Sequence, residues 1–180
     1  AECIGGEELN THPLQAAHRY AINFGQMPLS EAALWPDLLA IVEKRVRPER
    51  SKMTGYSVAE KRNENWWQYG TFAAALETAI ASKSRCLAIS QVTAHHAISF
   101  QPTSRIFMHT VVVFPLDSYA AFCALQTRCH ELWARFFGSS MADTLRYTST
   151  DCLENYPFPE GFESDAGLEA AGKAYYEFRA

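Results

Sequence analysis

The stretch C-L-A-I-S-Q-V-T-A-H-H-A-I-S-F-Q, from Cys86 to Gln101, is the part of the sequence that indicates the fold most directly. Two mainly apolar runs, C-L-A-I-S-Q-V and A-I-S-F-Q, flank the polar turn Thr93–His96. Apolar and β-branched runs separated by a short polar segment are typical of two strands joined by a turn. Arg105–Pro115 predicts more strand, because it ends in the run T-V-V-V-F. The centre of the chain is therefore predicted to be a β cluster.

Segments with helical spacing lie on both sides of this β cluster. The clearest predicted helix covers Tyr119–Phe137, begins after Asp117 or Ser118 as N-cap and is stopped by Gly138. Its predicted inward stripe consists of Phe122, Leu125, Gln126, Cys129, Leu132, Trp133 and Phe136. Further predicted elements are a strand over His18–Gly25, a helix over Glu31–Arg47 capped by Ser30 and offset near Pro36, a partly helical Lys52–Asn65, a helix over Phe72–Ala81 capped by Thr71, and a tail helix over Gly167–Phe178. The expected fold class is α+β, with a central mixed β-sheet flanked by helices.

Length and composition fit one globular domain. The chain has 180 residues, of which 48% are hydrophobic and 20% charged. We expect a loose N-terminal segment over residues 1–17, a main domain over 18–160 and a helical tail over 161–180. The first residue is Ala1 rather than Met, which fits an excised fragment or a processed end.

Charge is unevenly distributed along the chain. The net charge is −4 and the pI about 5.9, whereas a compact nucleic-acid-binding domain often has a pI above about 9. Residues 44–62 nevertheless hold seven bases and two acids, a net charge of +5, and residues 160–180 hold five acids and two bases, a net charge of −3. The basic segment is a candidate for phosphate contacts, and the alternative is a solvated helix face.

Cysteine usage and hydropathy place the chain in a reducing, aqueous compartment. The five cysteines are scattered and form no C-x-x-C pair, which favours reduced, buried thiols and a cytoplasmic location. No apolar run approaches the roughly 18 residues of a membrane span, and no signal peptide is visible. No membrane partner is therefore expected.

Residue types and spacing bear on three kinds of site: a metal site, a Cys–His nucleophile pair and a phosphate-binding loop. Cys86, His95, His96 and His109 would need to converge from separate strands to bind a metal, and the tight local spacing of zinc sites is missing. A Cys–His nucleophile pair is open for Cys86 with His95, whereas the adjacent Cys129 and His130 point in different directions on a helix. No Gly-rich phosphate loop occurs. These residues alone indicate a globular mixed domain with a basic segment and do not decide its function.

Five motifs, taken together, resemble one protein family. R-Y-A-I-N-F-G-Q-M-P-L-S-E-A, V-R-P-E-R-S-K, W-W-Q-Y-G, H-E-L-W-A-R-F-F-G-S-S-M and L-R-Y-T-S-T-D-C-L-E-N-Y-P-F-P occur in this order between Arg19 and Pro159. This ordered set resembles the target recognition region of the type IIG/IIL, MmeI-like restriction–methylation enzymes and of related adenine-specific DNA methylases. The resemblance covers most of the chain.

The resemblance implies that the chain is part of a larger protein. Parent proteins of this family join an adenine-N6 methyltransferase domain, which uses S-adenosylmethionine, to the recognition region, and many carry an N-terminal nuclease. This chain has neither the Gly-rich cofactor loop nor the N-P-P-[YF] loop of the methyltransferase, and Asn155–Phe158 holds similar letters in another order. No E-x-K nuclease signature occurs. We therefore expect a non-catalytic fragment that binds no cofactor itself, with double-stranded DNA and the methyltransferase domain of the parent chain as its partners.

The resemblance also suggests which residues contact DNA. Base edges are read in the major groove by side chains with hydrogen-bond donors and acceptors, and phosphate contacts hold the register. The candidate base-reading residues, from the segment Ser90–His109 that matches the family's central strand-and-loop part, are Gln91, Thr93, His95, His96, Arg105 and His109. The candidate phosphate contacts are Arg45, Arg47, Arg50, Lys52, Arg62 and Arg146. The alternative function is a structural or protein-interaction domain without base readout, favoured by the 13% aromatic content and the acidic C-terminal segment.

The last of the five motifs predicts a structural clasp. Thr148 is placed to cap a short helical turn, with Asp151 three residues on as the acid of a capping box. Tyr156 and Phe158 each precede a proline, which favours extended backbone. We expect Leu153, Tyr156 and Phe158 to anchor this segment to the body of the domain.

Overall fold

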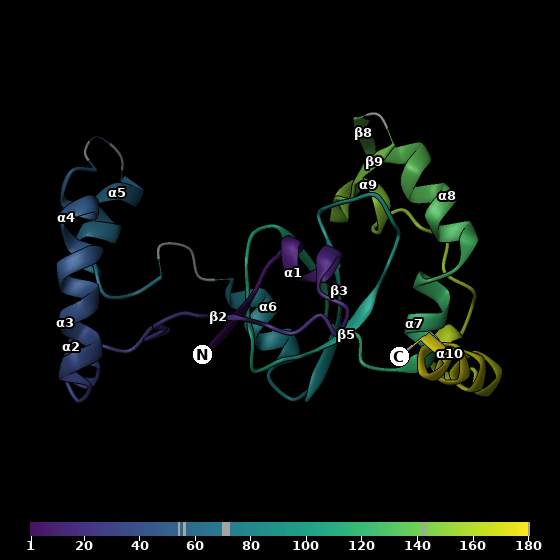
Figure 1. Cartoon of the computed structure of the whole chain (residues 1–180), viewed down its shortest axis with the longest axis horizontal. Helices are drawn as coiled ribbons and strands as arrows, with labels where there is room; N and C mark the ends of the chain where they lie inside the picture. The colour runs from purple at the N-terminus through teal and green to yellow at the C-terminus, as the bar shows by residue number, and fades with distance from the viewer. Residues whose placement is uncertain (54, 56, 70–72, 142, 180) are drawn as a thin grey trace. The chain divides into compact units, whose positions relative to one another are not determined.

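The computed structural model describes residues 1–53, 55, 57–69, 73–141 and 143–179 (Figure 1). The chain divides into two compact units. We call Ala21–Ala74, together with Ala1, the helical unit, and Glu2–Tyr20 together with Ala75–Ala180 the sheet unit. Residues 1–17, which we expected to be loose, instead form β1 (Glu2–Ile4) and α1 (Gly6–Thr11) of the sheet unit. This segment is ordered because β1 pairs with β2 (Arg19–Tyr20) and β6 (Ile106–Phe107), and because Asn10 on α1 donates hydrogen bonds to Ser90 and Val92.

The helical unit contains α2 (Leu29–Ala32), α3 (Pro36–Arg45), α4 (Arg47–Ser51) and α5 (Ser57–Glu64). The predicted helix over Glu31–Arg47 is split because Pro36 starts α3 as its first residue, where the missing N–H of proline costs nothing. Ser30 lies inside α2 and does not cap it. Phe24, Ala32, Val42 and Trp66 form a small buried core. Thr71 and Phe72, the predicted start of the next helix, lie outside the described residues.

The described residues of the sheet unit form three small sheets rather than the one central sheet that the sequence predicts. The first has the order β2-β1-β6, with β2 at Arg19–Tyr20 and β6 at Ile106–Phe107. The second has the order β5-β3-β7, formed by β3 (Arg85–Ser90), β5 (Ser99–Pro102) and β7 (Val111–Phe114). The third has the order β4-β9-β8, formed by β4 (Val92–Thr93), β8 (Ser139–Met141) and β9 (Thr144–Arg146). The predicted α+β class is confirmed, and the sheet is divided because the strands bend at Gln91 and between β6 and β7.

Helices pack around these sheets. They are α6 (Ala74–Ile80), α7 (Tyr119–Leu125), α8 (Arg128–Phe137), α9 (Ser149–Cys152), the 3-10 turn η1 (Phe162–Ser164) and α10 (Ala166–Arg179). The tail helix predicted over Gly167–Phe178 is confirmed as α10. The buried core joins β3, β7 and α7 to the segment Leu145–Cys152. The short strand predicted over His18–Gly25 reaches only Arg19–Tyr20.

The long helix predicted over Tyr119–Phe137 is broken into α7 and α8. Ser118 caps α7 as predicted, but Thr127 caps a second helix by accepting a hydrogen bond from the backbone N–H of His130. The break shifts the helical phase, so that His130 and Ala134 face the core of the sheet unit while Leu132 and Phe136 are exposed. Cys129, Leu132 and Phe136 were therefore wrongly predicted to face inward.

The clasp is confirmed, except that the Asp151 carboxylate accepts from the Thr148 hydroxyl and not from the Thr148 backbone N–H that a capping box uses. Thr148 caps α9, because its hydroxyl accepts the backbone N–H of Asp151, and this hydroxyl donates to the Asp151 carboxylate at 2.7 Å. Leu153 and Phe158 pack against the core, and the Tyr156 ring lies 4.4 Å from the His130 ring. The segment Leu145–Pro159 therefore fastens α8 to the sheets and is not an open loop.

Candidate nucleic-acid interface

The middle sheet gathers several polar side chains at one of its ends. β3 is antiparallel to both of its neighbours, with Ala88 opposite Ser99 and Ser90 opposite Val111. The end of β3 therefore coincides with the beginnings of β5 and β7. We call this place the exit end, formed by Gln91, the turn 93–96 before β5 and the turn 109–110 before β7.

Three of the six candidate base-reading residues lie at the exit end with exposed or half-exposed side chains. His95 and His109 are exposed, each in one of the two turns. Gln91 is half-buried, and its backbone is fixed on both sides: its N–H donates to the carbonyl of Thr110 at 2.8 Å, and its carbonyl accepts from the N–H of Tyr147 at 2.7 Å. A fixed backbone restricts where the Gln91 amide can reach, as base readout requires.

The other three candidates are used inside the protein. The hydroxyl of Thr93 donates to the carbonyl of His95 at 2.7 Å and closes the turn. His96 is buried, and burial, followed by the nearby His130, lowers its pKa to about 4. Arg105 donates to Glu2 at 3.0 Å and to Gln101 at 2.5 Å. Thr93 and His96 belong to the turn before β5, whereas Arg105 follows β5, toward the opposite end of the sheet. We assign none of the three to base contacts.

Arg146 lies in the middle strand of the neighbouring sheet, next to the exit end. Its partners across the sheet are Val92 on β4 and Ser139 on β8, and all three residues are exposed. Leu145, the next residue on β9, is fully buried on the opposite face. Among the described residues Arg146 has no hydrogen-bond or ion-pair partner for its side chain, so its charge is available to an external anion.

The helix α1 braces the exit end. The side-chain amide of Asn10 donates to Ser90 Oγ at 3.2 Å and to the carbonyl of Val92 at 2.9 Å. The N–H of Gly6 donates to Thr110 Oγ1 at 2.9 Å, and a side chain at Gly6 would overlap Ser90 Oγ. Sequence reasoning missed Asn10 and Thr110, because Asn10 lies in the segment expected to be loose.

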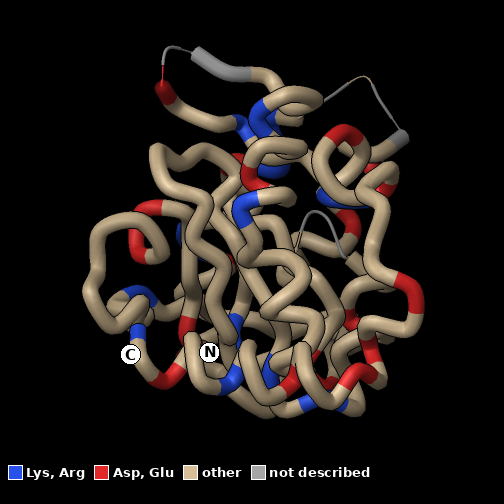
Figure 2. The backbone as a smooth tube through the Cα atoms, turned by 90° about the vertical axis from the view of Figure 1, so that its right-hand side faces the viewer, with Lys and Arg blue, Asp and Glu red and all other residues tan. Residues whose placement is uncertain are grey.

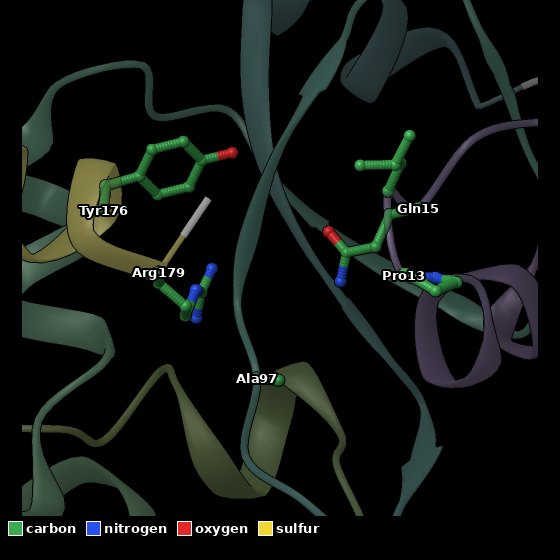
Figure 3. Close-up of a pocket in the computed structure, with 6 residues that line it drawn as sticks. Pro13, Gln15, Ala97, Tyr176 and Arg179 are labelled. Atoms are coloured by element: carbon green, nitrogen blue, oxygen red, sulfur yellow. The ribbon is translucent and has the colours of Figure 1, made fainter.

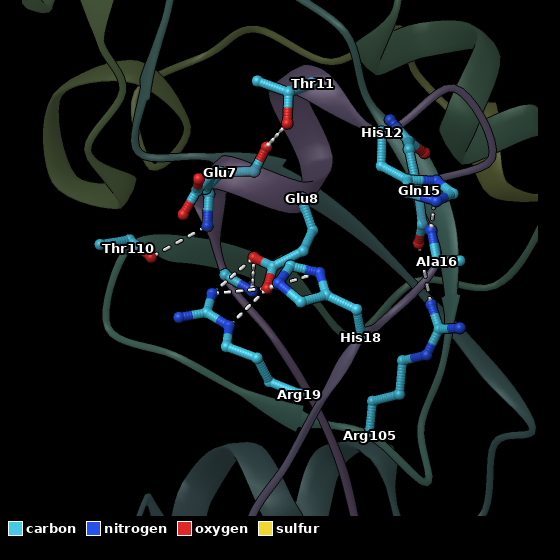
Figure 4. A network of polar contacts seen from close by, with 12 residues as sticks. Glu7, Glu8, Thr11, His12, Gln15, Ala16, His18, Arg19, Arg105 and Thr110 are labelled. Carbon is cyan, nitrogen blue, oxygen red and sulfur yellow. Dashed lines mark hydrogen bonds and ion pairs between the residues drawn. The ribbon is translucent and has the colours of Figure 1, made fainter.

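A buried carboxylate holds α1 in place, as Figure 4 shows. Glu8 is fully buried and accepts two hydrogen bonds of 2.6 Å from the Arg19 guanidinium and one of 3.0 Å from the N–H of Gly5. Burial alone raises the pKa of Glu8, but the hydrogen bonds from Arg19 and the backbone outweigh it, so the pKa lies below its ordinary value. The ionised pair therefore ties the start of α1 to β2.

The Lys and Arg side chains of the helical unit differ in whether they form ion pairs or hydrogen bonds within the protein. Arg47 pairs with Glu43 at 2.5 Å and lies 5.2 Å from the centre of the Trp66 ring, and Lys52 pairs with Glu49 at 2.9 Å. Arg50 donates to backbone carbonyls, and Arg62 lines a pocket described below. Arg45 is exposed and has no partner among the described residues. Figure 2 shows Lys and Arg interspersed with Asp and Glu along the backbone.

The alternative Cys–His sites do not assemble. Cys86 is buried, and burial raises the pKa of its thiol to about 11, so it stays protonated and unreactive at neutral pH. Cys129 is exposed, contrary to the expectation of buried thiols, whereas His130 is buried and donates from Nδ1 to the carbonyl of Leu125 at 2.7 Å. Its Nε2 lies 3.1 Å from the Tyr147 hydroxyl and 3.2 Å from the carbonyl oxygen of Cys152, and burial lowers the pKa of the ring. No group of three His, Cys, Asp or Glu residues within the described ranges could hold a metal ion.

A pocket of about 330 Å³ lies elsewhere in the sheet unit (Figure 3). Tyr176 and Arg179 line one side, and Pro13 and Gln15 line the other. The Arg179 guanidinium already donates to the carbonyl of Ile98 at 2.6 Å and to Gln126 at 3.3 Å. Arg179 therefore joins α10 to the loop before β5, and we assign no ligand to this pocket.

Comparison with known proteins found similarity in structure alone. No protein-family model matches the chain, and no curated protein matches it in sequence. A solved structure, described as that of the type IIL restriction–modification enzyme MmeI in complex with DNA, matches over 99% of this chain with a TM-score of 0.71 and 18% sequence identity. The chain shares its fold with one part of that enzyme. It spans 22% of the MmeI chain, so the similarity concerns one region of a longer protein.

The length and apolar character of the helices bear on whether the chain could cross a membrane. None of the helices in the described part of the chain combines the length and the apolar character needed to cross a membrane.

Proposed function

We propose that this chain is the DNA sequence-recognition part of a larger adenine-N6 DNA methyltransferase of a restriction–modification system. The observation that carries the proposal is the fold match to MmeI, whose structure was solved with DNA, over 99% of this chain. The five ordered motifs support the same assignment from the sequence. The parent protein would supply S-adenosylmethionine binding and methyl transfer in another domain, and this part would carry no catalytic residue.

The exit end supplies groups suited to base readout. The Gln91 amide presents a donor and an acceptor, and such an amide pairs with adenine in the major groove. His95 and His109 add ring nitrogens from the two neighbouring turns, and Arg146 adds a free cation beside them for a phosphate. In this proposal Gln91, His95 and His109 read bases, and Arg146 and Arg45 contact phosphates.

Salt-dependent binding tests the phosphate contact of Arg146. Fluorescence anisotropy with random-sequence duplexes should give an affinity that falls with salt, and Arg146→Gln should reduce the slope of log affinity against log salt by about 1. Lys173→Gln removes the same charge from an exposed position on α10 and should leave the slope unchanged. A slope that Arg146→Gln does not change would remove Arg146 from the interface. No duplex binding at low salt would contradict the proposed function.

An interaction domain without base readout remains the second candidate. Leu34, in the turn between α2 and α3, is exposed, as are Leu38 and Ile41 on α3. Exposed apolar side chains of this kind are expected on a surface that contacts another protein domain. This candidate predicts that Gln91→Ala/His109→Ala at the exit end leaves the sequence preference unaltered.

A further inference from the structure

The helical unit contains a second polar pocket, of about 210 Å³. It lies between the loop after Phe24 and the C-terminal part of α5 with the residues that follow. Its lining consists of Gln26, Val58, Lys61, Arg62, Asn65, Gln68 and Tyr69. Because one water occupies about 30 Å³ in the liquid, this volume accommodates a group larger than one or two waters.

Side-chain hydrogen bonds to the backbone fix the walls of this pocket. On one side, Trp67 Nε1 and Gln68 Nε2 both donate to the carbonyl of Met27, at 2.8 and 3.0 Å. On the other side, the Arg50 guanidinium donates to the carbonyl of Asn65 at 3.0 Å and to that of Arg62 at 3.5 Å. A cation at the end of a helix satisfies carbonyls that the helix leaves unpaired. Arg50 is therefore a positioning residue for the pocket.

The charge of the pocket is positive. Every charged residue in the described lining is basic, namely Lys61 and Arg62. Lys61 is exposed, and its ammonium has no partner among the described residues. The pKa of Arg50 is lowered by burial and then by the positive charge of Arg62, so like charges repel each other here. A bound anion would relieve this repulsion.

Amide groups add neutral hydrogen-bond donors to these cations. A side-chain amide has two N–H bonds. Asn65 uses one of them on the carbonyl of Lys61 at 3.2 Å, and Gln68 uses one on Met27. Each amide retains an N–H for a ligand. Two cations and several N–H groups around one space are the donor set that phosphate oxygens prefer.

We propose that this pocket binds a phosphate group through Lys61 and Arg62, with the amides of Gln26, Asn65 and Gln68 as further donors. Two sources share this chemistry, a phosphodiester of the DNA backbone and a free phosphate compound. The DNA source rests on the function proposed above and would give the helical unit a grip on the backbone while the exit end reads bases. The phosphate site itself does not depend on that function.

Titration of the ¹⁵N-labelled 180-residue chain with inorganic phosphate, at constant ionic strength, tests the site. The side-chain amide signals of Asn65 and Gln68 should shift saturably, with a dissociation constant on the order of millimolar. Lys61→Gln, which changes an exposed side chain, should weaken binding at least about threefold, and Lys61→Gln/Arg62→Gln should abolish it. The control Lys44→Gln/Lys173→Gln removes the same charge from exposed positions on α3 and α10 and should keep the wild-type response. Shifts that do not saturate, or that the control reduces equally, would overturn the proposal.

Duplex binding distinguishes the two sources of phosphate. If the backbone occupies the pocket, Lys61→Gln/Arg62→Gln should reduce the salt slope of duplex affinity by about 1–2 while the control changes it less. An unchanged slope together with lost phosphate binding would assign the pocket to free phosphate compounds. If the chain binds no duplex at all, the proposed DNA function fails, and the phosphate titration still decides the pocket.

Discussion

At the scale of single residues, the ion pair of Glu8 with Arg19 makes a stability prediction. Glu8→Gln should lower the free energy of unfolding at pH 7 by about 2 kcal/mol, because it removes a buried carboxylate that accepts three hydrogen bonds. We expect less than the full cost of breaking a buried pair, because the Arg19 side chain is 40% exposed and water solvates it. Urea unfolding of both proteins measures the difference.

The same pair predicts a dependence on acid. Since the pKa of Glu8 is lower in the folded protein than its ordinary value of 4.5, its contribution is complete above that value and is lost as pH falls through the folded pKa. The difference between wild type and Glu8→Gln should therefore shrink below about pH 4.5. Glu7→Gln, at the exposed neighbouring position, serves as the control and should cost less than about 0.5 kcal/mol. A constant difference across this range would contradict the ionised pair.

The sequence predicted which residues begin and end helices better than it predicted which side chains are exposed. Ser118, Thr148 and Gly138 act as predicted, because a cap depends on neighbours within four residues. His96 and Arg105 have the residue types of base readers, yet tertiary packing uses both inside the protein. Nothing local in the sequence distinguishes them from the exposed His95 and His109.

At the scale of elements, the contact of α10 with α7 depends on a glycine. A side-chain carbon at Gly172 would be driven onto the backbone carbonyl of Tyr119 and would lie 3.1 Å from Cys123 Cβ. Gly172→Ala should therefore destabilise the protein by about 2 kcal/mol, although alanine favours a helix over glycine by up to about 1 kcal/mol. Thermal unfolding compared with Gly167→Ala, where the added carbon would lie 3.1 Å from the exposed Asp165 carboxylate and near no backbone atom of another described element, measures the effect. Equal melting temperatures for the two variants would show that α10 does not pack closely on α7.

Element boundaries show where pattern reasoning reaches its limit. Hydrophobic spacing predicted helix over Tyr119–Phe137, and the structure has helix there on both sides of a break at Gln126–Thr127. Gln126 leaves the helical pattern because its side chain serves the loop before β5: it accepts from the N–H of Ile98 at 2.7 Å and donates to the carbonyl of His96 at 2.6 Å. The break therefore combines the local Thr127 cap with a contact between residues 28 apart in the chain.

At the scale of the whole molecule, the α+β class follows from the order of strand-like and helix-like runs in the sequence. The exit end and the phosphate pocket do not follow from that order. The exit end exists because antiparallel pairing brings the end of β3 next to the beginnings of β5 and β7. The phosphate pocket exists because the loop around Met27 folds against the residues after α5. Both depend on long-range pairing, so residue types alone could not predict which side chains lie together.

The central claim is that the exit end of this chain reads DNA sequence for a methyltransferase. The most direct measurement is mapping N6-methyladenine across the genome of cells that express the parent protein with either the wild-type sequence or Gln91→Ala/His109→Ala. The account predicts methylation within one motif for the wild type and, for the variant, continued methylation in a motif that has become degenerate at one or two positions, since each lost base contact costs about 1–3 kcal/mol of discrimination. Lys173→Gln should leave the motif unchanged. An identical motif in wild type and variant, or no N6-methyladenine in either, would contradict the account.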